Sequence, residues 1–159
     1  MIGSWYKNII LDRKMTNFEM VKEFNRKFKL DFKEEPTRPE DIDSIELGLN
    51  LITEECDELT EEHDQLVSEH FAISRGILAE HDYTELRNKL AKETADLLYV
   101  VYGYADRLGI PIDEVFAEVH RSNMSKLDKD GNPTYNEQGK LLKPDNYSPA
   151  DPGKIMDGE

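Results

Sequence analysis

Two groups of acidic residues in this sequence could together bind a metal ion. The first runs Glu54-Glu55-Cys56-Asp57-Glu58, and the second runs Glu93-Thr94-Ala95-Asp96, directly before an apolar segment at residues 97–102. Carboxylate oxygens are the ligands that hard divalent cations such as Mg²⁺ and Mn²⁺ prefer. A divalent cation also relieves the repulsion between clustered carboxylates, which would otherwise favour their protonation.

Helical spacing places several of these acids where core side chains belong. At about 100° per residue, Leu47, Leu51, Glu54 and Glu58 share one stripe, with Glu55 beside it. The second group puts Glu93 inside an apolar stripe and Asp96 at its edge; that stripe contains Leu90, Leu97, Val100 and Tyr104. Buried carboxylates are costly unless compensated, which favours a metal site. The alternative is that the acids lie on the solvated faces of two charged helices.

The composition narrows the class of protein. The 159 residues carry 34 Asp and Glu against 20 Lys and Arg, a formal net charge of −14. So acidic a chain argues against binding to nucleic acid or to an anionic membrane. The single cysteine, Cys56, cannot form an internal disulfide, and no signal peptide or membrane span is evident, so a cytoplasmic protein is expected. We expect one domain over residues 1–159, with a helical core at 17–126 and a turn-rich extension at 127–159.

The apolar pattern predicts four helices. The first begins after Thr16, which forms a capping-box pattern with Glu19, and runs to about Leu30. The second begins near Pro39 and continues well past the first acid group. The third starts at a cap on Asp82 or Thr84 and ends at Gly109. Because residues 97–105 are apolar nearly all round, the third helix should be central and buried.

The fourth helix and the tail complete the expected layout. Asp113 is the predicted cap of the fourth helix, which should bury Val115, Phe116 and Val119. The dipeptides Asp130-Gly131 and Gln138-Gly139 are turn signals that predict a small hairpin. Prolines at 144, 149 and 152 then predict a tail without regular structure.

The combined motifs resemble a known family. Glu54-Glu55-x-x-Glu58 followed by Glu93-x-x-Asp96 is similar to the EExxE…ExxD pattern of the MazG-like all-α nucleoside triphosphate pyrophosphohydrolases. Segments 95–103 and 115–126, the Asp130-Gly131 turn and the tail from Lys143 to Tyr147 resemble its phosphoribosyl-ATP pyrophosphohydrolase-like branch. The resemblance covers roughly residues 17–150. Residues 62–84 look like an insertion that either lengthens two helices or adds a short one.

The resemblance implies a fold and an activity. The expected fold is all-α, a four-helix bundle built as a homodimer, or as a homotetramer formed from two dimers. The expected reaction is hydrolysis of a nucleoside triphosphate between its α and β phosphates, with Mg²⁺ or Mn²⁺ as cofactor. A pyrimidine deoxynucleotide such as dUTP or dCTP is the leading substrate, and phosphoribosyl-ATP is the alternative. The competing class is a non-enzymatic acidic helical protein that binds a basic partner.

The resemblance also implies roles for individual residues. The metal ligands would be Glu54, Glu58, Glu93 and Asp96, while Glu55 would either complete the metal shell or orient and deprotonate the attacking water. Substrate contacts would come from six further residues, with Lys126 also assisting catalysis: Asn25, Arg121, Asn123, Lys126, Lys143 and Tyr147. Four of these residues have an ordinary alternative. Asn25 could be a satisfied core amide, Arg121 and Lys126 could interact with a helix C-terminus, and Lys143 could be an exposed tail lysine.

Overall fold

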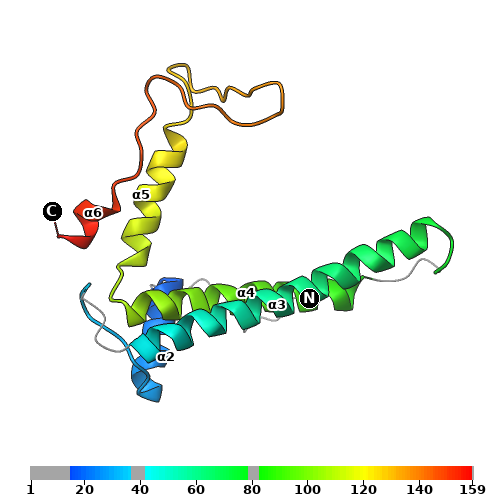
Figure 1. The fold of residues 1–159 in the computed structure, drawn as a ribbon, viewed down its shortest axis with the longest axis horizontal. Coiled ribbons are helices and arrows are strands. Elements are labelled where there is room, and N and C mark those ends of the chain that lie inside the picture. Colours follow the sequence, from blue (N-terminus) through cyan, green and yellow to red (C-terminus); the bar gives the residue numbers. More distant parts are fainter. Residues whose placement is uncertain (1–14, 37–41, 79–82, 159) are drawn as a thin grey trace.

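The computed structural model describes residues 15–36, 42–78 and 83–158. They form five helices, labelled as in Figure 1: α2 (Asn17–Phe28), α3 (Ile42–Ser74), α4 (Thr84–Arg107), α5 (Ile112–Met124) and α6 (Pro152–Met156). Within these ranges the only β pairing consists of isolated bridges, Leu127 with Pro133 and Tyr135 with Leu141. The all-α expectation is confirmed, and the bridges lie where the hairpin was predicted. None of the described helices is long and apolar enough to cross a membrane.

The two longest helices, α3 and α4, run antiparallel and pack side by side (Figure 1). Gly48 of α3 permits the close approach, because a Cβ at this position would lie 2.9 Å from Tyr104 Cδ2 of α4. Helix α3 continues to Ser74 and α4 begins only at Thr84, so the segment at 62–84 lengthens α3, and the expectation that it lengthens both helices is wrong for α4. Its residues 79–82, which include the predicted cap Asp82, lie outside the described residues. The cap position is Tyr83, whose side chain makes no capping hydrogen bond.

Helix α2 packs across α4. Thr16 and Glu19 form the predicted capping box, and the helix ends at Phe28, before a left-handed Lys29. Phe18 of α2 is buried, with its ring centroid 6.0 Å from that of Tyr102 in α4. An apolar face of α2 is therefore fixed against the side of α4 that α3 leaves open.

A tight turn joins α4 to α5 and anchors the segment that follows α2. Gly109 has φ +67°, and a Cβ there would lie 2.1 Å from the carbonyl oxygen of Glu35. The Lys33 amide donates a 2.8 Å hydrogen bond to the Asp106 carbonyl oxygen. Only glycine fits this crossing of two backbones. Asp113 does not cap α5 as predicted; its carboxylate instead accepts a 2.6 Å hydrogen bond from the Thr16 hydroxyl.

Helix α5 leaves the α3–α4 pair and carries the C-terminal segment with it (Figure 1). The tail returns along α5, where Arg121 donates to the Pro149 carbonyl oxygen at 3.0 Å and Ser148 donates its amide to Ser125 Oγ at 2.9 Å. The expectation of a tail without regular structure is wrong in part, because residues 152–156 form α6, which packs on α5. We call α5 and residues 125–158 the arm.

Two predictions about which helix surfaces are buried are wrong for a single chain. Leu98 and Val101 of α4, expected in a central buried helix, are 50% and 37% exposed, and Phe116 of α5 is 69% exposed. The reason is geometric: α2 and α3 cover two sides of α4, whereas the described part of the chain leaves its remaining face uncovered. Because α5 stands away from α2, α3 and α4, one chain does not close the predicted four-helix bundle.

Candidate metal centre

Three carboxylates converge between α3 and α4. Glu55 comes from α3, and Glu93 and Asp96 come from one face of α4; each offers an oxygen, and these oxygens all lie within 4.8 Å of one another. Two residues three apart on α4 share a face, and the antiparallel pairing brings Glu55 opposite to them. Glu93 is 8% exposed and Asp96 is half-buried, which matches their predicted places inside and at the edge of the stripe. We call these three residues the acid triad.

Glu55 has an electrostatic environment that suits a cation. Burial raises the pKa of its carboxyl group, and the nearby charges of Glu58, Asp96 and Glu93 raise it further. Its Oε2 atom is buried and has no hydrogen-bond partner among the residues that the structure describes. A buried, unpartnered carboxylate oxygen beside two other carboxylates is costly without a cation. The triad therefore fits a hard divalent ion, although the geometry does not distinguish Mg²⁺ from Mn²⁺.

The stripe predicted for α3 is wrong in its register. Glu54 and Glu58 are exposed, and Leu47 is 50% exposed. The side that faces α4 is half-buried and contains Leu51, Ile52, Glu55, Leu59 and Glu62. It lies about one residue, or about 100°, around the helix from the predicted stripe. Glu55 is consequently the member of the first acid group that belongs to the triad, and Glu54 and Glu58 lie outside it on α3.

Lys92 is a site residue that the sequence analysis missed. Its Nζ lies 2.9 Å from Glu93 Oε2 and 2.8 Å from Asp96 Oδ2. These two hydrogen bonds raise the pKa of Lys92, so it stays charged at any physiological pH. The signal was present in the sequence, because Lys92 precedes Asp96 by four residues and so shares its helix face.

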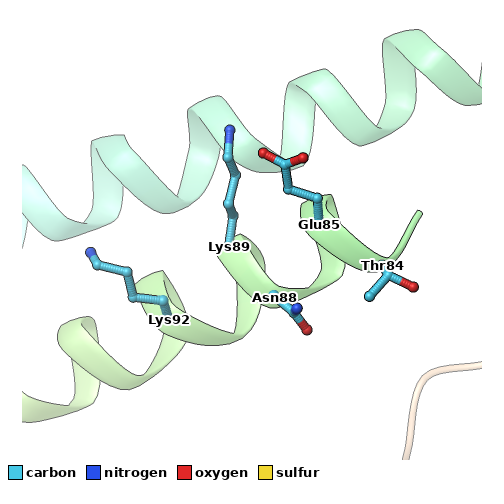
Figure 2. Close-up of a pocket in the computed structure, with 5 residues that line it drawn as sticks. All are labelled: Thr84, Glu85, Asn88, Lys89 and Lys92. Atoms are coloured by element: carbon cyan, nitrogen blue, oxygen red, sulfur yellow. The ribbon is translucent and has the colours of Figure 1, made fainter. Parts of the chain in front are cut away.

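An open groove of about 560 Å³ runs along the first turns of α4, next to the triad. Figure 2 shows that Glu85, Lys89 and Lys92 point toward α3, while Thr84 and Asn88 point away from it. Lys89 pairs with Glu62 of α3 at 3.5 Å. The groove thus leaves the outer side of Lys92 open to solvent.

Asn25 lies in the core of the helix packing. Its Nδ2 donates a 2.8 Å hydrogen bond to Asp106 Oδ2, and both residues are buried. This arrangement favours the alternative in which Asn25 is a satisfied core amide over a role in contacting the nucleobase. An apolar cavity of about 90 Å³ adjoins it, too small for a base and its sugar.

The predicted cationic residues gather on the arm. Lys143 Nζ lies 4.5 Å from the centre of the Tyr147 ring, and Lys126 donates to Asn123 Oδ1 at 2.7 Å. A hydrogen bond with Ser122 lowers the pKa of Tyr147, and the charges of Lys143 and Lys126 lower it further. Both lysines are therefore near enough for their charges to act on the Tyr147 hydroxyl. We call Lys126, Lys143 and Tyr147 the arm cluster.

Arg121 is not part of the arm cluster and makes its contacts within the arm. Its guanidinium makes a bidentate pair with Glu118, at 2.7 and 2.8 Å, and also reaches the Pro149 carbonyl oxygen. With three donors engaged, it ties the tail to α5. Neither Arg121 nor the arm cluster meets the acid triad in this chain, because α5 carries them away from the middle of α4 (Figure 1).

The model of the phosphoribosyl-ATP pyrophosphohydrolase family matches residues 21–123. The chain belongs to this family. Since the family is part of the MazG-like all-α superfamily, the resemblance noted from the motifs is confirmed. The match contains the whole triad and ends before Lys126, so most of the arm lies beyond it. A search of the curated proteins finds no match to the chain.

Membership of the phosphoribosyl-ATP pyrophosphohydrolase family bears on the class of the protein and on its substrate. It identifies a pyrophosphohydrolase family, which favours an enzyme over an acidic binding protein. Its name also points to phosphoribosyl-ATP, so the alternative substrate gains support and the leading pyrimidine deoxynucleotide does not. The triad is consistent with a divalent metal site, and the family implies a nucleotide-like substrate.

Proposed function

We propose that this protein hydrolyses phosphoribosyl-ATP between its α and β phosphates, with a divalent cation bound at the acid triad. The observation that carries the proposal is the convergence of Glu55, Glu93 and Asp96 within one family-matched helix pair. The name of the matched family supports phosphoribosyl-ATP as the substrate. No observation favours a pyrimidine deoxynucleotide, so that earlier preference is set aside.

The triad residues would hold the cation, with Mg²⁺ as the expected ion and Mn²⁺ as a substitute. When bound, such an ion neutralises triphosphate oxygens and lowers the pKa of a water molecule that it contacts. Glu55 can be a ligand or can orient and deprotonate the attacking water. The short separation of its oxygen from those of Glu93 and Asp96 favours the ligand role.

Glu54 and Glu58 would act around the triad. Both are exposed on α3, and Glu58 is close enough for its charge to raise the pKa of Glu55. Either carboxylate can bind the metal ion at a coordination position that the triad does not fill. If Glu55 is a ligand, one of these two carboxylates remains to hold the attacking water by a hydrogen bond and accept its proton.

A second copy of the chain would complete the site. The arm cluster lies in the segment that follows α5, away from the triad of its own chain, and Leu98, Val101 and Phe116 expose large apolar areas. A homodimer in which these surfaces meet would cover the open face of α4 and close the four-helix bundle. It would also allow Lys126 and Lys143 of one chain to approach the triad of the other. A homotetramer built from two such dimers is compatible with the same contacts.

The acid triad and the arm cluster together suit a substrate with phosphates at both ends. Phosphoribosyl-ATP carries a triphosphate, which requires cations at an acidic site, and a separate ribose phosphate. Lys126, Lys143 and Tyr147 offer that second phosphate two ammonium groups and a hydroxyl. Asn123, beside Lys126, could add an amide donor. A simple nucleoside triphosphate has no group for such a cluster apart from its own polyphosphate.

Pyrophosphate release from phosphoribosyl-ATP, dUTP, dCTP and ATP tests the proposal, each with Mg²⁺, Mn²⁺ or EDTA. The expected result is metal-dependent release that is fastest with phosphoribosyl-ATP. Faster release from dUTP or dCTP would restore the pyrimidine alternative. Absence of release from every substrate by folded, metal-bound protein would overturn the proposed activity.

A further inference from the structure

Lys92 contacts two of the three carboxylates that would hold the proposed metal ion. Its ammonium group lies 2.9 Å from Glu93 Oε2 and 2.8 Å from Asp96 Oδ2. We propose that Lys92 is a built-in cation of the acid triad, which neutralises it in the metal-free protein and is displaced when a divalent ion binds. This inference rests on the proposed function for the metal site itself.

The competition follows from the shared oxygens. A Mg²⁺ or Mn²⁺ ion bound to Glu93 and Asp96 needs their oxygens at about 2.0–2.2 Å. An ammonium group that keeps both hydrogen bonds would then lie within a few ångströms of the ion. At such a distance two positive charges repel strongly, and both are held by the same two carboxylates. Lys92 must therefore withdraw when the ion enters.

Lys92 is placed so that it can withdraw. Its side chain is 63% exposed and lies at the open groove along α4, so its four-carbon stem has room to turn outward (Figure 2). Glu93 cannot move out in the same way, because its side chain is only 10% exposed. The buried carboxylate thus keeps a cation in either state: the lysine before metal binding and the divalent ion after it.

Lys89 supplies a matched control from the same helix. It lies almost one turn before Lys92, points toward α3 in the same view, and pairs with Glu62 at 3.5 Å. Glu62 is not part of the acid triad. Removal of either lysine changes the net charge by one unit, but only Lys92 occupies triad oxygens.

The test measures Mn²⁺ affinity of the full-length protein by electron paramagnetic resonance of free Mn²⁺. Lys92→Met should tighten the dissociation constant by at least about threefold, since the ion no longer displaces two ion pairs. Lys89→Met should leave it within about twofold, because its charge is screened by solvent. Lys92→Arg retains a cation able to pair with both carboxylates, and should return the affinity toward that of the wild type.

Thermal unfolding gives a second readout. The metal-free Lys92→Met variant should unfold at a lower temperature than the wild type, and Mn²⁺ should raise that temperature by more than it does for the wild type. Equal or weaker Mn²⁺ binding by Lys92→Met would overturn this inference while the proposed metal site stands. Absence of Mn²⁺ binding by both proteins would overturn the inference and the metal-dependent function together.

Discussion

Asn25 and Asp106, which are 81 positions apart, are joined by a 2.8 Å hydrogen bond in the core between α2 and α4. Asp106 is fully buried, and its other carboxylate oxygen, Oδ1, has no hydrogen-bond partner among the described residues. The Asn25 amide is thus the side-chain donor on which this buried acid depends. The bond fixes α2 on α4 beside the turn that leads into the arm.

Asn25→Ala should therefore destabilise the protein by about 1–3 kcal/mol, because it leaves a buried carboxylate without its donor. Urea denaturation measures the change in the free energy of unfolding. KM for the substrate should change little once the protein is folded. A variant of unchanged stability whose KM rises would instead give Asn25 the role in substrate contact that the sequence analysis considered.

Gly48→Ala should weaken the packing of α3 on α4. The added methyl group would lie 2.9 Å from Tyr104 Cδ2 and 3.1 Å from Arg107 Cδ, which forces neighbouring atoms to shift. Overpacking of this kind typically costs about 1–3 kcal/mol. Gly103→Ala in α4 is the control, because its nearest neighbour, Val21 Cγ1, would be 3.9 Å away. Thermal unfolding of both variants should show a loss of stability for Gly48→Ala alone.

Glu118 should make docking of the tail depend on pH. The Arg121 guanidinium and the Asp151 backbone amide lower the pKa of its carboxyl group from 4.5 to about 2. Because the pKa is lower in the folded state, the stabilisation is fully present above about pH 4.5 and is lost as the pH falls toward 2. The hydrogen-exchange protection factors of residues 148–156, which correct for the effect of pH on intrinsic exchange, should fall across that range. In Glu118→Gln these protection factors should already be low at pH 6, and equal protection in both proteins would contradict the account.

Glu55→Gln should weaken Mn²⁺ binding as well as turnover. The reason is that Glu55 offers an oxygen within 4.8 Å of those from Glu93 and Asp96, and its buried Oε2 has no other partner. Calorimetric titration with Mn²⁺ should show a dissociation constant at least about tenfold weaker than in the wild type. Full metal affinity with lost turnover would assign Glu55 to the attacking water instead.

The positions of the helices, and the convergence of the second acid group with the first, followed from the sequence because they depend on local spacing. The capping box at Thr16 and the stop at Gly109 fixed helix ends, and Glu93 lies inside the stripe that its spacing predicted. The prediction of which side of α3 faces the core was wrong, because the acid-rich sequence of this helix fits two registers about 100° apart. Only the contact with α4 selects Glu55 over Glu54 as the inward residue.

The sequence could not predict which surfaces of one chain stay uncovered. Residues such as Leu98 and Phe116 have the character of core residues, but the direction in which α5 leaves Gly109 exposes them. That direction depends on the close contact of Gly109 with Glu35, which is remote in sequence. Lys92 was overlooked for a different reason: a lysine among acids suggests a surface pair until the carboxylates are seen to converge.

The most direct test compares pyrophosphate release from phosphoribosyl-ATP by the wild type and by Glu93→Gln, each with Mg²⁺ or EDTA. Glu93 is the buried member of the triad, and the substitution keeps its size while removing its charge. The account predicts release that requires Mg²⁺ and falls at least about 100-fold in the variant. Undiminished release by folded Glu93→Gln, or release that persists in EDTA, would contradict a metal-dependent reaction at this site.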